Sequence, residues 1–261
     1  MKAADENATL YQKEYSAEFA SNFDEIVGWR DREEHERARL VSLLRSYGAR
    51  RILDAACGTG FHLSLLSQAD FDLVGTDGSE AMVAKAKMNL SERGMSVPLH
   101  VCDWQELTQC NLGLFDAVLC LGDSFAHLLN VEQQLVALQQ FFELLIPGGV
   151  LVLDHRNYDR IVAMGSYVEQ PTGYCCCGDT PPRELTVEAD GLVTCRYRGG
   201  KGTEFVFRTF PVSKIGLANS LKKVGFGDVQ ILNGSPGGAS PHSSEIDFVL
   251  EVATKAVSST R

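Results

Sequence analysis

Charged and polar side chains follow two apolar, strand-like segments of this chain. The segment "FDAVLCL" continues into "GDSFAHL" at residues 122–128, which contains Asp123 and His127. The segment "GGVLVL" continues into "DHRNYD" at residues 154–159, which contains Arg156. A buried strand has no need of an acid, a histidine and an arginine at its carboxyl end, whereas a binding site does. The planar guanidinium of Arg156 is suited to bidentate capture of a small carboxylate.

A second set of chemistry-bearing residues surrounds a glycine-rich turn. In "ILDAACGTGFH", Asp54 ends a strand-like segment, and Gly58 and Gly60 form a tight turn before a helical pattern. Glycines at such a turn let the backbone approach a ligand closely. Asp77 follows the next strand, 17 residues after Gly60, where its carboxylate can accept hydrogen bonds from both hydroxyls of a ribose. A simple tight turn is the alternative, but the strand, the helix and the downstream acid together favour a nucleoside site.

The glycine turn differs from that of dinucleotide dehydrogenases, because the third glycine of their pattern would fall at Leu63. The order strand–Asp–x–x–Cys–Gly–Thr–Gly instead resembles the first motif of class I S-adenosylmethionine-dependent methyltransferases. In that family the first acid and the glycine turn hold the methionine half of the cofactor, and the acid after the second strand holds the ribose. By the same resemblance, "VCDW" supplies Asp103 for the exocyclic amine of adenine and Trp104 to cover the ring.

The elements that position these residues alternate between strand and helix from about residue 50. Buried apolar strands separated by amphipathic helices indicate an α/β fold, a doubly wound, mostly parallel seven-stranded Rossmann-like sheet of the class I methyltransferase kind. We expect Gly148 and Gly149 to end the helix before the fifth strand. Short alternating pieces after residue 159 predict a small antiparallel lid insertion. The expected organisation is a helical, cofactor-covering segment at 1–50, a Rossmann-like domain at 51–160 and 211–256, and the lid at 161–210.

Two longer segments carry a narrower resemblance. "FDAVLCLGDSFAHL" and "LVLDHRNYD" are similar to glycine N-methyltransferase and to the bacterial glycine/sarcosine N-methyltransferases that build betaine, and the similarity runs from about Tyr11 to Lys255. The resemblance implies in-line methyl transfer to the neutral amine of glycine, sarcosine or a close relative. Good alignment contributes on the order of 7–11 kcal/mol to such a reaction. No general base is obviously required, and no catalytic residue is assigned.

The resemblance also implies a role for individual residues. Arg156 corresponds to the arginine that binds the amino-acid carboxylate, and Tyr197 and Tyr174 are lid tyrosines of the substrate site, which Asp123 completes. Phe23 stands where the family usually has tryptophan. The residues implied to contact the cofactor are Tyr15, Phe23, Arg32, Asp54, Ala56, Gly58, Gly60, Asp77, Asp103, Trp104, Leu121 and His127.

Two departures from the family pattern and two alternative roles affect how the site is interpreted. Asp123 stands where the family commonly has asparagine, and an aspartate would attract an ammonium and favour keeping it protonated. Our hypothesis is that Asp123 adapts the site to a more substituted or differently charged amine. Cys175 and Cys176 stand where lid tyrosines are expected. Arg156 has an alternative role as a structural arginine paired with Asp154 or Asp159, and His127 has one as a helix cap.

Two other functions are compatible with the sequence. A methyltransferase for another small amine or carboxylate is the first alternative. A low-turnover protein that senses S-adenosylmethionine is the second, although a pure sensor needs no clamp such as Arg156. The formal net charge of −10 argues against nucleic-acid binding. The apolar runs are strand-sized and the N-terminus lacks the apolar core of a secretory signal, so we expect a cytoplasmic protein without a membrane span. The oligomeric state is left open.

The positions of the cysteines predict free thiols rather than disulfides or a metal site. We expect Cys57, Cys102, Cys110 and Cys120 to be packed free thiols, because they lie in or beside strands of an apparently cytosolic chain. In "GYCCCGD" three adjacent thiols cannot readily converge on one tetrahedral ion, and the CxxC spacing is absent. We therefore expect no metal site.

Overall fold

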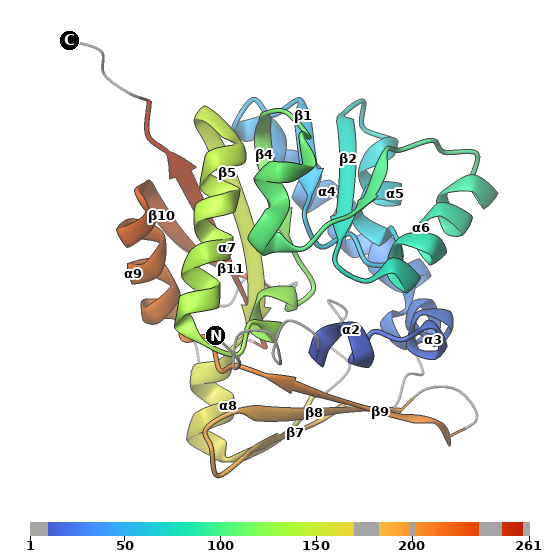
Figure 1. Ribbon diagram of the computed structural model, residues 1–261, viewed down its shortest axis with the longest axis vertical. Helices are drawn as coiled ribbons and strands as arrows, with labels where there is room; N and C mark the ends of the chain where they lie inside the picture. The colour runs from blue at the N-terminus through green and yellow to red at the C-terminus, as the bar shows by residue number, and fades with distance from the viewer. Residues whose placement is uncertain (1–9, 170–182, 199–201, 235–246, 258–261) are drawn as a thin grey trace.

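The computed structural model describes residues 10–169, 183–198, 202–234 and 247–257. Its centre is a seven-stranded sheet with the order β10-β11-β5-β4-β1-β2-β3 (Figure 1). All neighbouring strands run parallel except β11, which is antiparallel to both β5 and β10. The bounds are β1 Arg51–Asp54, β2 Asp72–Asp77, β3 Leu99–Val101, β4 Phe115–Cys120, β5 Leu145–Arg156, β10 Phe226–Asn233 and β11 Phe248–Lys255. The predicted doubly wound, mostly parallel seven-stranded sheet is thereby confirmed.

Helices cover both faces of this sheet, because successive strand residues point to opposite faces. Leu53 in β1 packs in a core with the helices α7 and α9, whereas its neighbour Ile52 packs in a core with α4 and α5. In Figure 1, α7 accordingly crosses in front of the sheet, and α4 lies behind it. The bounds are α4 Trp29–Ser46, α5 Phe61–Ser67, α6 Glu80–Glu92, α7 Val131–Leu144 and α9 Lys214–Val224.

The end of α7 differs from the sequence prediction. The helix ends at Leu144 and β5 begins at Leu145, so Gly148 and Gly149 lie inside the strand rather than at the helix end. The register of β5 against β4 shifts within this stretch, from Phe115 opposite Leu145 to Ala117 opposite Val150. A Cβ at Gly149 would approach two backbone oxygens to 2.9 and 3.0 Å, so only glycine fits there without a shift. Gly149 is therefore needed where β5 passes close to the backbone of Asp116 in β4.

A smaller antiparallel sheet lies at the carboxyl edge of the large one (Figure 1). The short helices α2 and α3 lie between the two sheets on one side. The rings of Phe19 in α3 and Phe207 in β9 are 4.6 Å apart, which joins the N-terminal helices to the small sheet. The bounds are α2 Leu10–Glu14, α3 Ala17–Val27, α8 Tyr158–Met164, β6 Ser166–Glu169, β7 Arg183–Val187, β8 Val193–Arg198 and β9 Glu204–Thr209. No helix in the described ranges is long and apolar enough to cross a membrane.

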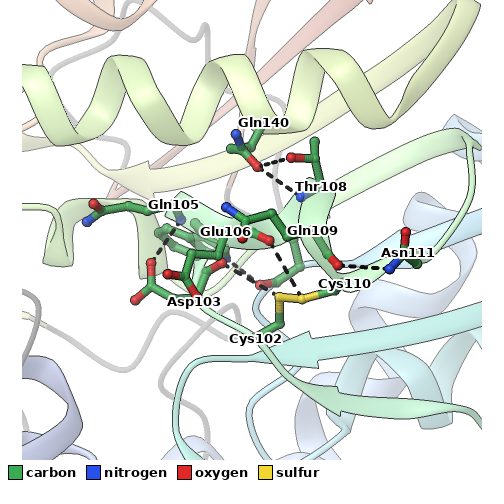
Figure 2. Close-up of a disulfide and its surroundings, with 11 residues drawn as sticks. Cys102, Asp103, Gln105, Glu106, Thr108, Gln109, Cys110, Asn111 and Gln140 are labelled. Carbon is green, nitrogen blue, oxygen red and sulfur yellow. Dashed lines mark hydrogen bonds between the residues drawn. A yellow bond between two sulfur atoms is a disulfide. The ribbon is translucent and has the colours of Figure 1, made fainter.

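The prediction for the cysteines was wrong in part. Cys102 and Cys110 form a disulfide, whereas Cys57 and Cys120 are buried free thiols (Figure 2). The 3₁₀ helix η1 (Trp104–Cys110) follows β3 and turns the chain back, which leaves the Cα atoms of Cys102 and Cys110 6.9 Å apart. The redox state of a cellular compartment does not determine whether a local turn brings two cysteines together.

Candidate active site

A cleft opens at the carboxyl edge of the large sheet. The ends of β1, β2 and β3 supply one side of it, and the helix α2 and the 3₁₀ helix η2 (Ser124–His127) supply the other. The order of the sheet reverses between β1 and β4, and ligands of such folds bind at this switch point. The lining residues are Tyr11, Tyr15, Ala55, Ala56, Asp77, Gly78, Asp103, Trp104, Ser124, His127 and Leu128.

Asp77 at the end of β2 is held by the backbone of two turns. Its Oδ2 accepts from the N–H of Gly58 at 2.9 Å, and its Oδ1 accepts from the N–H of Ser79 at 2.8 Å. Gly58 has φ +51°, a left-handed conformation that glycine adopts at little cost. Burial raises the pKa of Asp77 to about 6. An ionised carboxylate has about four acceptor sites, so the two N–H groups leave room for two ribose hydroxyls.

Asp103 and Trp104 begin η1 on the neighbouring side of the cleft. The Oδ1 of Asp103 accepts from the N–H of Gln105 at 2.9 Å and so caps this helix (Figure 2). Its Oδ2 accepts from the hydroxyl of Tyr11 at 2.7 Å. The indole Nε1 of Trp104 donates to the carbonyl of Ala55 at 2.5 Å, which fixes the ring against the end of β1. A carboxylate and a flat ring thus lie side by side, as recognition of an adenine requires.

The other wall holds a buried hydrogen-bonded pair. The hydroxyl of Tyr15 lies 2.8 Å from Nε2 of His127. Burial lowers the pKa of His127 to about 4, so the imidazole is neutral near pH 7 and its Nε2 accepts from the phenol. Glu14 lies behind the ring, with its Oε2 3.9 Å from Nδ1 of His127. Burial raises the pKa of Glu14 to about 7.

Three of the four predicted substrate residues meet at the end of β5, next to this wall but outside the cleft lining. The guanidinium of Arg156 pairs with the carboxylate of Asp123 and donates to the hydroxyl of Tyr197 at 3.3 Å. Asp154 instead accepts from the N–H of Asp123 at 2.8 Å, and Asp159 pairs with a lysine. The predicted alternative partners of Arg156, Asp154 and Asp159, are thus engaged elsewhere. Tyr174, Cys175 and Cys176 lie outside the described residues.

Half of the predicted cofactor residues line the cleft, namely Tyr15, Ala56, Asp77, Asp103, Trp104 and His127. The other six do not line it. Arg32 forms a buried ion pair with Glu36, 2.6 Å from Nε to Oε1, and lies over the ring of Phe61. Phe23 packs against Phe19. Leu121 is part of the hydrophobic core that the sheet forms with α4 and α5.

The glycine turn after β1 adjoins the lining residues Ala55 and Ala56. Asp54 is fully buried, and its Oδ2 has no hydrogen-bond partner among the described residues. Its Oδ1 accepts from the N–H of Ala56 at 3.3 Å. Gly60 has φ +93°, a left-handed conformation that favours glycine, and a Cβ there would make only ordinary contacts of 3.4 Å with Ala86 and Leu90. The turn therefore shapes the backbone around Ala56 rather than presenting its own side chains.

Sequence reasoning missed five lining residues. Ala55, Gly78, Ser124 and Leu128 adjoin predicted residues and could have been found by including sequence neighbours. Tyr11 carried no signal beyond being an aromatic residue in the N-terminal segment. Near the cleft, the hydroxyl of Tyr158 in the motif "DHRNYD" donates to Oδ2 of Asp123 at 2.9 Å.

The chemical groups that line the cleft, and their net charge, fit S-adenosylmethionine. Two carboxylates, Asp77 and Asp103, face it from neighbouring strand ends, with the ring of Trp104 beside them. Among the described residues that line it, none is lysine or arginine, and its histidine is neutral at pH 7. A net negative lining suits a ligand with a positively charged sulfur. Asp77 and Asp103 would hold the ribose and the adenine.

The sheet order, the glycine turn and the acids after the first two strands define a class I S-adenosylmethionine-dependent methyltransferase. The family described as "Methyltransferase domain" matches residues 52–149. The glycine/sarcosine N-methyltransferase of Aphanothece halophytica is 35% identical over 94% of this chain and 91% of its own length. The glycine/sarcosine/dimethylglycine N-methyltransferase of Actinopolyspora halophila is 33% identical over 94% of this chain and 43% of its own length. The chain belongs to the glycine/sarcosine N-methyltransferase family, and it is an enzyme that uses S-adenosylmethionine as methyl donor.

Solved structures agree on the fold. The CcbJ methyltransferase of Streptomyces caelestis superposes with a TM-score of 0.72 at 18% identity, over 93% of this chain and 98% of that one. The CalS10 amino pentose methyltransferase of Micromonospora echinaspora, solved with S-adenosylmethionine bound, gives a TM-score of 0.62 at 22% identity, over 88% of this chain and 95% of that one.

Proposed function

We propose that this enzyme methylates the amino nitrogen of glycine or sarcosine. The observation that carries the proposal is the buried guanidinium of Arg156 beside Tyr197, at a strand end next to a cleft suited to a nucleoside. A buried arginine with its fork at a binding site is the side chain best suited to hold a small carboxylate. Relatives that match over nearly the whole chain are named for the same reaction.

The residues supply position more than covalent chemistry. S-adenosylmethionine, when bound, supplies a methyl group on a positively charged sulfur. The acceptor nitrogen must arrive with a free lone pair, form the new C–N bond as the C–S bond breaks, and lose a proton to solvent. Arg156 would hold the carboxylate end of the acceptor, and Tyr15 and His127 would form the wall between acceptor and cleft. Holding the nitrogen in line with the methyl carbon lowers the barrier by on the order of 7–11 kcal/mol.

A turnover assay with a panel of acceptors tests this proposal. S-adenosylhomocysteine formation is measured with glycine, sarcosine, dimethylglycine and small amines that lack a carboxylate. Turnover on glycine or sarcosine is the expected result. Turnover only on amines without a carboxylate would show that the enzyme methylates another small amine instead. No turnover on any acceptor, together with tight cofactor binding, would favour a sensor.

A matched pair of arginine variants tests the clamp. Arg156→Ala should raise the KM for the amino acid at least tenfold and leave the Kd for the cofactor unchanged, since a charge-assisted hydrogen bond is worth about 1.5–3 kcal/mol. Arg196→Ala is the control, because Arg196 lies exposed on β8 in a pair with Glu204. Equal losses for amino acid and cofactor would assign Arg156 a structural role. The predicted cytoplasmic location, and the absence of nucleic-acid partners, stay predictions.

A further inference from the structure

The substrate clamp already holds a carboxylate that belongs to the chain. Asp123 and Arg156 are 2% and 3% exposed, and Oδ2 of Asp123 pairs with the guanidinium nitrogen Nη1. The Oδ1 of the same carboxylate accepts from the backbone N–H of Arg156 at 3.0 Å. One aspartate therefore engages both the side chain and the backbone of the arginine that the proposed function assigns to the substrate.

Two further hydrogen bonds hold this aspartate in place. Its φ of +64° is left-handed, a conformation that is uncommon for residues other than glycine. Its N–H donates to Oδ1 of Asp154 at 2.8 Å, and the hydroxyl of Tyr158 donates to its Oδ2 at 2.9 Å. Aspartate tolerates this conformation better than most residues, and its hydrogen-bond partners fix the position of its carboxylate on Arg156.

We propose that Asp123 is a specificity-determining residue whose carboxylate occupies the guanidinium of Arg156 until a substrate carboxylate takes its place. The inference rests on the proposed function, because it takes Arg156 as the carboxylate clamp. The buried pair is neutral as a whole. Replacing Asp123 on the guanidinium by a second carboxylate adds one negative charge to a buried site, which is costly unless a positive charge comes with it.

The exchange therefore favours carboxylates whose nitrogen carries a positive charge or acquires one during methyl transfer. An amino acid brings its carboxylate to Arg156 and its nitrogen near Asp123, and the nitrogen gains positive charge as the methyl group arrives. A simple monocarboxylate such as acetate brings no such charge and leaves Asp123 without a counter-ion. Asp154, Tyr158 and Tyr197 are hydrogen-bonded to the pair. Further out, His155 pairs with Glu251, and Arg183 lies over the ring of Tyr197. Neither Asp154 nor a protonated tyrosine can supply the missing positive charge.

The substitution Asp123→Asn tests the exchange directly. Asparagine tolerates the left-handed backbone and keeps nearly the same volume, but it leaves the buried charge of Arg156 without its carboxylate. The expected result is a lower Tm that rises with added sodium acetate, whereas the Tm of the wild type does not respond to acetate beyond an equal concentration of sodium chloride. The KM for the amino acid should fall by about tenfold, with no change in the Kd for S-adenosylhomocysteine.

The control is Glu251→Gln, which removes a different buried carboxylate. Glu251 in β11 is 1% exposed and lies 3.4 Å from Nε2 of His155, one residue from Arg156. This variant should also lower the Tm, because it breaks a buried pair, but acetate should not restore it. Restoration of both variants by acetate, or of neither, would overturn the proposal.

A measurement on the wild type covers the case in which Asp123→Asn does not fold. Trimethylglycine carries a carboxylate and a fixed positive charge and cannot accept a methyl group. It should inhibit the wild type at a concentration at least tenfold below that of acetate. Equal inhibition by the two would overturn the exchange. If the enzyme shows no turnover at all, the proposed function fails, but the acetate-dependent Tm of Asp123→Asn still decides whether Asp123 and an external carboxylate compete for Arg156.

Discussion

The hydroxyl of Tyr11 lies 2.7 Å from Oδ2 of Asp103, and this hydrogen bond joins the N-terminal helix α2 to the end of β3. The same phenol lies on the turn after β2, where a Cβ at Gly78 would come within 2.1 Å of its oxygen. Burial, and then the hydrogen bond to Asp103, raise the pKa of Tyr11, so the hydroxyl stays a donor at neutral pH. Tyr11 therefore covers both strand ends that carry the candidate nucleoside carboxylates.

Removing this cover should speed release of the cofactor. Tyr11→Ala is expected to weaken S-adenosylhomocysteine binding by about tenfold, mainly through a faster off-rate. Gly78→Ala should do the same with Tyr11 still present, because the new methyl group displaces the phenol. Stopped-flow measurement of ligand release reads both variants. Gly227→Ala is the matched control, since a Cβ there meets nothing closer than 3.6 Å. Unchanged or tighter binding in Tyr11→Ala would contradict the covering role.

The sequence predicted the layered fold because strand and helix periods are local signals. Apolar strands alternating with amphipathic helices put Asp54, Asp77 and Asp103 at one edge before any contact was known, and the structure places Asp77 and Asp103 on one cleft. The contact of Tyr11 with Asp103 joins residues 92 positions apart, and that of Asp123 with Arg156 joins residues 33 apart. Such contacts depend on how elements pack, which no local pattern encodes.

The position of Arg32 could have been predicted better. Arg32 and Glu36 stand four residues apart in the helical pattern "RDREEHER", a spacing at which opposite charges meet on one helix face. The resemblance placed the arginine on the cofactor, and the structure places it on the glutamate. A role for Arg32 at the methionine end of the cofactor stays a prediction.

Cofactor binding should depend on pH through Asp77. Burial raises the pKa of this carboxyl to about 6, so it is ionised at pH 8 and protonated at pH 5. A protonated carboxyl has lost its negative charge and part of its acceptor capacity. The affinity for S-adenosylmethionine should be constant above about pH 7 and fall as the pH drops through 6. Calorimetric titration from pH 5 to 8 measures this, and Asp77→Asn should bind weakly with a flatter profile. A wild-type affinity that is independent of pH would contradict the assignment.

Asp54 should make the folded protein less stable at high pH. Burial raises its pKa from 3.8 to about 6, so the folded state holds this proton more tightly than the unfolded state does. The resulting stabilisation is present below about pH 4 and is lost as the pH rises through 6. The full shift corresponds to about 3 kcal/mol. Asp54→Asn should therefore gain Tm relative to the wild type at pH 8 and lose that advantage at pH 4. The same Tm difference at both pH values would show that ionisation of Asp54 is not the cause.

The disulfide should stabilise both the fold and the adenine side of the cleft. Cys102 and Cys110 are separated by eight positions (Figure 2). The loop that they close contains Asp103 and Trp104. Closing a loop of this length stabilises a fold by about 2–3 kcal/mol, through loss of freedom in the unfolded chain. Reduction by a dithiol should lower the free energy of unfolding by about that amount. It should also weaken S-adenosylhomocysteine binding several-fold, since the capped start of η1 is then less firmly held.

The double variant Cys102→Ser, Cys110→Ser separates this bond from other thiol chemistry. Denaturant unfolding with and without the dithiol should differ for the wild type and coincide for the variant. Mass spectrometry of a digest made without reductant should recover the two cysteines in one cross-linked peptide. Because thiol pools keep cytosolic cysteines reduced, the enzyme in such a compartment would show the weaker, reduced-state affinity. Equal stability of the wild type with and without the dithiol, when the cross-linked peptide is present, would show that the bond does not hold η1 in place.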